Sequence, residues 1–104
     1  FRSKPIAVAT VINMEIEFDL AKDVINIEKH DVSLAEANHL EWDELEVWID
    51  QRMDYGETRL IGYAPLSDRL HCVVYTDREH SRRIISLRKA NRREVLNYVR
   101  IHHH

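Results

Sequence analysis

The sequence predicts an α+β fold in which two N-terminal helices and one C-terminal helix cover one face of an antiparallel sheet. Two observations predict it. Four short segments rich in β-branched or alternating apolar residues follow one another between about residues 45 and 87. The connections between these four strands are short, which requires them to be antiparallel neighbours. With a strand and two helices before them and a helix after them, the expected order is β-α-α-β-β-β-β-α.

The first strand is expected over about residues 6 to 18. Apolar residues there fall on one parity, namely Ile6, Val8, Ile12, Met14, Ile16 and Phe18. Residues 1–13 are interpreted as a native extension or as vector-derived sequence, since the chain begins with Phe1. We expect a single domain over residues 14–101, and we interpret the histidines 102–104 as a purification tag.

The next segment predicts two helices in succession. Asp19 is a good N-cap for the first helix, whose apolar stripe consists of Leu20, Val24 and Ile27. This helix is expected to end at His30, with Asp31 in the left-handed conformation that stops it. Ser33 and Glu36 then form a capping-box pattern, which predicts a short second helix over residues 34–40.

The strands follow after an acidic loop at residues 41–44. We expect strands over residues 45–49 and 59–64, a turn over residues 65–69, and a central hairpin of residues 70–75 and 83–87 around a polar turn at residues 77–81. Asn91 and Glu94 have the spacing of a capping box. They predict the start of a C-terminal helix, whose apolar side consists of Val95, Leu96, Tyr98 and Val99.

Acidic and basic residues are unevenly distributed along the chain. Residues 14–57 contain fourteen acidic and three basic residues, whereas residues 78–100 contain eight basic and two acidic ones, and the whole chain has a net charge of −3. Such a chain can present one acidic and one basic face. Its overall acidity argues against a general coat for nucleic acid, but a local basic site for RNA or for an acidic protein segment stays open.

The basic residues around the last strand and helix form the best candidate site. Arg88 and Lys89 lie where the strand ends, and the helix N-terminus beyond them adds amides that favour an anion. Arg88 is the first candidate for a phosphate ligand, with Lys89, Arg92 and Arg93 steering RNA. Arg83 is the second candidate. In a regular strand Arg83 and Arg88 face opposite sides of the sheet, so they can serve one site only if a bulge or a strand end intervenes.

Cleavage of RNA without a metal needs a base, cations near the phosphate and an acid. Lys29 and His30 end the first helix, where positive charge is favoured, so His30 suits the role of acid better than that of base. Arg59, close to Glu57, is a further candidate catalytic residue. The structural alternatives are a helix-dipole role for His30, a solvated Lys29, and a salt bridge between Glu57 and Arg59.

The sequence contains no pattern for a metal or a cofactor, and we expect neither: it lacks HExxH, a P-loop, GxSxG and paired cysteines. Cys72 is expected to be a buried, inert thiol. No apolar run approaches the length of a membrane span, and no cleavable signal peptide is evident. The single cysteine fits a reducing compartment, and we expect a cytoplasmic protein. Tyr75 and Tyr98 are expected to pack in the core, with base stacking as the alternative.

Several short segments, in this order and spacing, resemble a known family. They are Phe18-Asp19, Asn26, Lys29-His30-Asp31-Val32-Ser33, Glu36-Ala37, Tyr55-Gly56-Glu57-Thr58-Arg59, Ile61-Gly62, Val73-Val74-Tyr75-Thr76, the run from Arg83 to Ala90, Arg93-Glu94 and Tyr98. Over residues 14–99 the chain resembles the BrnT family, toxins of type II toxin–antitoxin pairs with a RelE-like ribonuclease fold. It departs from that family at Asp31, where glycine is common.

The resemblance implies a ribonuclease toxin that cleaves RNA without metal, blocks translation and is neutralised by a BrnA-type antitoxin. It also implies a hetero-oligomer, commonly of two toxins and two antitoxins, that contacts operator DNA only through the antitoxin and has no membrane partner. Two alternatives stay open. One is a protein-binding module without catalysis, in which the arginine cluster binds acidic antitoxin residues. The other is a small RNA-binding regulator.

Overall fold

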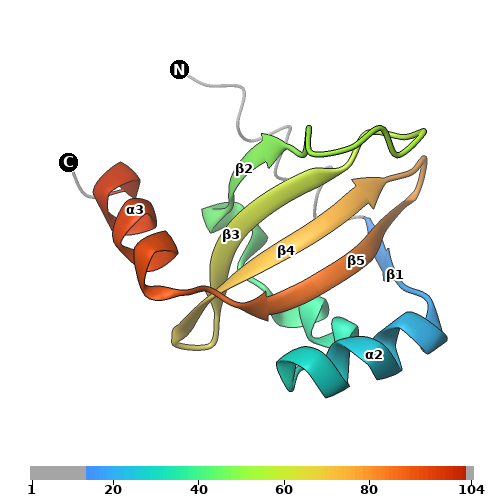
Figure 1. Cartoon of the computed structure of the whole chain (residues 1–104), viewed down its shortest axis with the longest axis horizontal. Helices are drawn as coiled ribbons and strands as arrows, with labels where there is room; N and C mark the ends of the chain where they lie inside the picture. The colour runs from blue at the N-terminus through green and yellow to red at the C-terminus, as the bar shows by residue number, and fades with distance from the viewer. Residues whose placement is uncertain (1–13, 103–104) are drawn as a thin grey trace.

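The structure is a computed structural model, and it describes residues 14–102. These residues form five strands and two α-helices, with two 3-10 helices between α2 and β2. In chain order they are β1 (Glu15–Glu17), α2 (Leu20–His30), η1 (Leu34–His39), η2 (Trp42–Glu44), β2 (Glu46–Ile49), β3 (Leu60–Leu66), β4 (Arg69–Asp77), β5 (Ser81–Lys89) and α3 (Arg92–His102). The class is therefore α+β, as predicted (Figure 1). The part of the expected first strand in residues 6–13 lies outside the described residues.

The sheet is mixed, which corrects the prediction of a wholly antiparallel one. Its strand order is β1-β5-β4-β3-β2. The strands from β2 to β5 pair antiparallel with their neighbours, as their short connections require. However, β1 pairs parallel with β5. No tight turn joins these two strands, since the rest of the domain lies between them in sequence, so nothing forces them to be antiparallel.

A β-bulge lies in the middle of the central hairpin. Val74 pairs with Ser86 and Tyr75 pairs with Ile84, so Ile85 has no partner on β4. One extra residue reverses the alternation of side chains beyond that point. Thr76 therefore pairs with Arg83 while Cys72 pairs with Arg88, and both arginines lie on the same face of the sheet.

The hydrophobic core lies between one face of the sheet and the segment that contains η1. This core face is formed by Ala64, Leu66, Val73, Tyr75, Ile84 and Leu87, which pack with Leu34, Ala37 and Leu40. We call the opposite face of the sheet the outer face. Residues that alternate with the core residues along a strand, and the residues that pair with them on the next strand, lie on this face. They include Tyr63, Cys72, Val74, Arg83 and Arg88.

Helix α2 does not pack as its apolar pattern predicts. The expected stripe is exposed, at 75% for Leu20, 58% for Val24 and 44% for Ile27. The buried residue of the helix is instead Asn26, whose side chain donates to the Leu87 carbonyl at 2.8 Å and accepts from the Leu87 amide at 3.3 Å. Asn26 thus acts as a strand partner for β5 beyond the short β1, which covers an edge that would otherwise be open.

Three local predictions about helix ends are confirmed. Asp19 accepts from the Lys22 amide at 3.0 Å, and Asp31 stops α2 at φ 60°. Asn91 and Glu94 form a reciprocal capping box with two bonds of 2.8 Å. The predicted second helix is a 3-10 helix rather than an α-helix.

The turn between β3 and β4 differs from the predicted one. The turn expected at residues 65–69 is shorter, because β3 continues through Pro65 and Ser67 makes the turn with φ 57°. Proline is tolerated there because β2 pairs with β3 only as far as Tyr63, so Pro65 has no ladder bond to donate.

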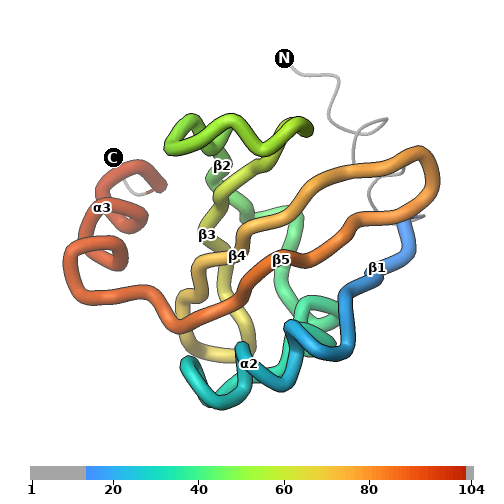
Figure 2. Tube along the Cα trace, turned by 45° about the vertical axis from the view of Figure 1, so that its right-hand side comes forward, coloured from blue at the N-terminus to red at the C-terminus, as the bar shows by residue number. Residues whose placement is uncertain are grey.

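Helix α3 lies apart from α2, at the opposite side of the molecule from β1 (Figures 1 and 2). It attaches through side chains: Tyr98 donates to the Glu44 carbonyl at 2.6 Å, and His102 lies 2.8 Å from Glu46. The expectation that all helices cover one face is therefore wrong, because α3 meets the outer face. Within residues 14–102, no helix has the length and apolar character needed to cross a membrane.

Candidate active site

The strongest constellation on the outer face is centred on Arg88 and Glu94. Arg88 donates from Nη1 and Nη2 to the two carboxylate oxygens of Glu94, each at 2.9 Å. Tyr63 also donates to Glu94, at 3.0 Å. Glu94 thereby connects β3, β5 and α3. The Arg88 hydrogen bonds hold the pKa of Glu94 at about 2, well below its usual value, and raise that of Arg88.

Arg88 keeps hydrogen-bonding capacity despite this ion pair. A guanidinium has five N–H groups, and three are used, two by Glu94 and one by the Lys89 carbonyl at 3.3 Å. The edge of the guanidinium that carries the Nε–H makes no hydrogen bond to the described residues. The Arg88 side chain is 34% exposed. Glu94 thus fixes the orientation of Arg88, while one edge can still bind a phosphate in bidentate fashion.

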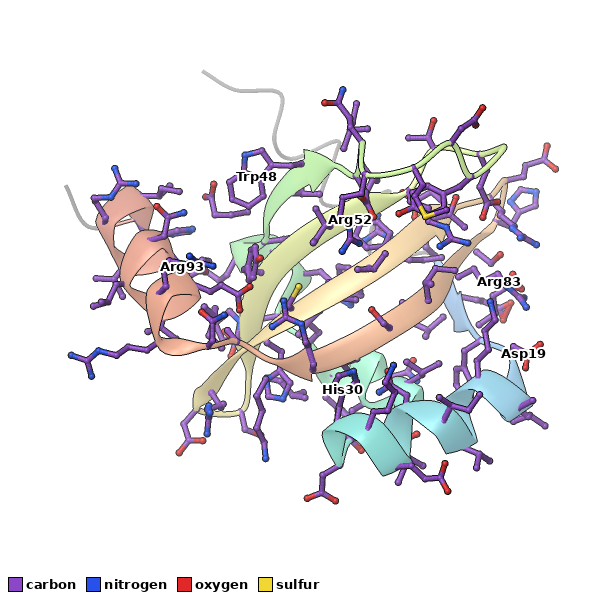
Figure 3. All side chains as sticks on the ribbon, in the orientation of Figure 1. Asp19, His30, Trp48, Arg52, Arg83 and Arg93 are labelled. Atoms are coloured by element: carbon purple, nitrogen blue, oxygen red, sulfur yellow. The ribbon has the colours of Figure 1, made fainter. Side chains whose placement is uncertain are left out.

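His30 lies close enough to both Lys29 and Arg88 for their charges to act on its imidazole, so it links three of the five candidate catalytic residues. Figure 3 shows His30 between α2 and β5. Partial burial lowers the pKa of His30, and the positive charges of Lys29 and Arg88 lower it further. This direction is opposite to the one expected from the helix C-terminus. A neutral imidazole at neutral pH suits a base, not the acid that the sequence favoured.

Arg83 and Arg59 lie at the other end of the outer face. They belong to a loose network in which Glu17 lies 3.6 Å from Arg83 and 3.9 Å from Arg78, and Glu57 lies 3.8 Å from Arg78 and Arg59. Figure 3 shows Arg83 beside Asp19, far from His30. Four residues of β5 lie between Arg83 and Arg88, a span of about 15 Å. The two ends therefore do not touch the same phosphate.

The expected RNA-steering residues are exposed and lie beyond Arg88. Lys89 ends β5, and Arg92 and Arg93 open α3. None of the three forms an ion pair within the described residues, so each can meet an anion. By contrast, Arg82 is buried at 7% exposure on the core face, where its guanidinium lies 4.5 Å from the rings of Trp42 and Tyr75. It is a structural residue.

Sequence reasoning missed three contributors to this face. Glu94 was predicted only as a helix cap, and Tyr63 was not singled out. Asp50 is 6% exposed and accepts from Arg52 at 2.7 and 2.8 Å and from Tyr55 at 3.2 Å, so it organises the loop over the outer face. Asp50 could have been noticed in the sequence only because it is an acidic residue directly after a predicted strand.

No group of three histidine, cysteine, aspartate or glutamate side chains in residues 14–102 is arranged to hold a metal ion. Cys72 is buried, as expected, and burial raises the pKa of its thiol. His71 is also buried and bonded to the Arg69 carbonyl at 2.9 Å, whereas His80 is exposed. None of these side chains adds to the site.

Comparisons with known proteins agree on one family. A family model described as "Ribonuclease toxin, BrnT, of type II toxin-antitoxin system" matches residues 18–94. Among solved structures, the 1.1 Å crystal structure of the Brucella abortus ribonuclease toxin BrnT is similar, with a TM-score of 0.61 and 21% identity. The match covers 76% of this chain and 99% of that one. No match is found among curated protein sequences.

Proposed function

The chain belongs to the BrnT family of ribonuclease toxins of type II toxin–antitoxin systems, and from this we propose that it cleaves RNA without a metal ion at Arg88 and His30. The observation that carries the proposal is the arrangement of Arg88. Glu94 holds its guanidinium in place and leaves one edge for a phosphate, next to an imidazole that is neutral at neutral pH. A fixed cation beside a base is what transesterification of RNA requires.

His30 is the base in this mechanism. Its neutral imidazole takes the proton from a ribose 2′-hydroxyl, and the 2′-oxygen forms a bond to the adjacent phosphorus. The bond from phosphorus to the 5′-oxygen breaks, and that oxygen takes a proton from solvent. The products are a 2′,3′-cyclic phosphate and a free 5′-hydroxyl. No atom changes its oxidation state in this step, and His30 is the proton acceptor.

Arg88 and Lys29 stabilise the negative charge that grows on the phosphate. Arg88 binds two phosphate oxygens through its Nε edge, and Lys29 contributes a nearby positive charge. Burial lowers the pKa of His30 and the same two cations lower it further, so the groups that bind the phosphate also favour the neutral form of the base. Lys89, Arg92 and Arg93 attract the RNA backbone toward this point.

The family implies a partner as well as a substrate. We propose that a BrnA-type antitoxin, in a complex of two toxins and two antitoxins, neutralises the chain in the cytoplasm. The complex meets operator DNA through the antitoxin alone. Because Arg83 and Arg59 lie far from Arg88, they do not bind the reacting phosphate. In this proposal they contact other parts of the RNA or the antitoxin.

The proposal is tested with purified protein and single-stranded RNA in EDTA. We expect cleavage to 2′,3′-cyclic phosphate ends, and a loss of rate of about 10²-fold or more in His30→Ala. Lys22→Ala, on the first turn of the same helix, should cleave like the unchanged protein. Intact RNA in EDTA, with cleavage restored by a divalent cation, contradicts the metal-free mechanism.

A second candidate, a protein-binding module without catalysis, is favoured by the exposed stripe of Leu20, Val24 and Ile27 on α2. Surface patches of this kind often meet a protein partner. A folded chain that binds the protein encoded beside it tightly, but neither cleaves RNA nor arrests growth, selects this alternative.

A further inference from the structure

A cleft between α3 and the β2–β3 edge has the chemistry of a nucleobase site. It is lined by Trp48, Tyr63, Arg93, Glu94, Asn97 and Tyr98, and has a volume of about 360 Å³. We propose that this cleft binds an unpaired base of the RNA, next to the phosphate held by Arg88. The inference rests on the proposed ribonuclease function and adds how that site selects its substrate.

The aromatic walls supply a stacking surface. Trp48 is 44% exposed on the edge strand β2, where Figure 3 labels it. Its ring lies edge-on to that of Tyr63, with ring centroids 5.9 Å apart and an angle of 73°. The hydrogen bond from Tyr98 to the Glu44 carbonyl fixes the opposite wall. An exposed tryptophan on a fixed frame is the kind of platform on which single-stranded nucleic acid stacks.

The polar groups of the cleft suit the edges of a base rather than an aliphatic side chain. Asn97 accepts a hydrogen bond from Arg100 through its carbonyl oxygen, while its amide nitrogen has no hydrogen-bond partner among the described residues. Arg93 also lines the cleft; it is exposed and forms no ion pair within residues 14–102. Amide and guanidinium groups are the common readers of base edges.

The cleft is continuous with the proposed phosphate site. Glu94 and Tyr63 line the cleft and also hold Arg88 through Glu94. A base in the cleft therefore places its flanking phosphate on the side of Arg88. Only an unpaired base can enter, because pairing would occupy the edge that Asn97 meets, so the substrate is single-stranded RNA.

Binding is measured with short 2′-O-methyl oligonucleotides of each base, which lack the 2′-hydroxyl nucleophile and stay intact. We expect Trp48→Ala to bind about 10-fold or more weakly than the unchanged protein, and Trp48→Phe to retain most of the affinity. Asn97→Ala should reduce the differences in affinity among the oligonucleotides of the four bases. Val47→Ala, the neighbouring residue on the other face of β2 with the same 44% exposure, should bind within about twofold of the unchanged protein.

Cleavage of matched 2′-hydroxyl oligonucleotides separates this inference from the function on which it rests. If the unchanged protein binds through Trp48 but does not cleave, the base site stands and the ribonuclease proposal falls. If Trp48→Ala folds, binds and cleaves like the unchanged protein, the base site is wrong and the ribonuclease proposal stands. If Trp48→Ala loses only antitoxin binding, the cleft is a protein interface and the inference is overturned.

Discussion

At the scale of single residues, the geometry of each ion pair separates structural arginines from functional ones. Arg82 is buried, donates to Asp77 at 2.7 and 2.9 Å and lies against two aromatic rings. Arg88 also has a bidentate partner, but it is one-third exposed and keeps a donor edge. Both look alike in sequence, since each is an arginine directly next to the same predicted strand, Arg82 before it and Arg88 after it.

Arg82→Ala should lower the free energy of unfolding by about 2–4 kcal/mol, because it removes a buried side chain, its ion pair with the exposed Asp77 and two cation–π contacts. Arg78→Ala, on the neighbouring turn, removes only contacts of 3.8 and 3.9 Å from a half-exposed side chain. It should cost less than about 1 kcal/mol. Urea unfolding of both variants measures the difference, and equal costs contradict the structural role of Arg82.

The pH dependence of cleavage reports on His30. As a base it must be neutral, so the rate should rise with pH through a midpoint below the ordinary histidine value of 6.5. Lys29→Ala removes a nearby positive charge, which makes protonation easier and moves this midpoint to higher pH. Lys22→Ala is the control and should leave it in place. A midpoint that moves to lower pH in Lys29→Ala would contradict the assignment of His30 as the base.

At the scale of elements, polar side chains attach both helices to the sheet. Asn26 attaches α2 to β5, and Glu94 attaches α3 to β3 and β5. The apolar periodicity of Leu20, Val24 and Ile27 correctly predicts that α2 is a helix, but it does not predict which side is buried. The buried side is set by hydrogen bonds to a strand sixty-one residues away, which no local pattern shows.

Asn26→Ala should lower the free energy of unfolding by about 2–4 kcal/mol. It removes bonds to the Val32 carbonyl and to both backbone groups of Leu87, and these buried groups then lack partners. Asn38→Ala removes one exposed bond to the Ala35 carbonyl and should cost less than about 0.5 kcal/mol. Thermal or urea unfolding compares the pair, and a tolerated Asn26→Ala contradicts this attachment of α2.

Glu94 should make the stability of the α3 contact depend on pH. Its pKa is lowered from 4.5 to about 2 by Arg88, so its contribution is complete above pH 4.5 and is lost as the pH falls toward 2. Glu94→Gln should therefore lose less stability across this window than the unchanged protein. Glu36→Gln, at an exposed position, is the control. If the free energy of unfolding falls equally with decreasing pH in Glu94→Gln and in the unchanged protein, the role of the ion pair is contradicted.

At the scale of the whole molecule, opposite charges mix more than the sequence suggests. Glu17 and Glu57, from the acidic half, lie beside Arg78 and Arg83 from the basic half. What stays basic is the end of β5 and the first turn of α3. The RNA surface is therefore smaller than the run of arginines implies, and it lies beside the proposed base site.

The sequence predicted the fold class, the four antiparallel strands and the helix caps, because alternation, short connections and capping residues act locally. It did not predict that Arg83 and Arg88 share a face, since the bulge at Ile85 depends on pairing with β4. It also placed His30, Lys29 and Arg88 among the candidates without showing that His30 lies near both cations. Their proximity depends on how Asn26 docks α2, which is a contact of tertiary structure.

The most direct test of the central claim is the single-turnover rate of RNA cleavage in EDTA for Arg88→Ala and Arg78→Ala, both checked for folding by unfolding curves. We predict that Arg88→Ala lowers the rate by about 10²-fold or more, because it removes the cation fixed at the phosphate. Arg78→Ala should cleave at nearly the rate of the unchanged protein. A folded Arg88→Ala variant that cleaves as fast as the unchanged protein would contradict the account.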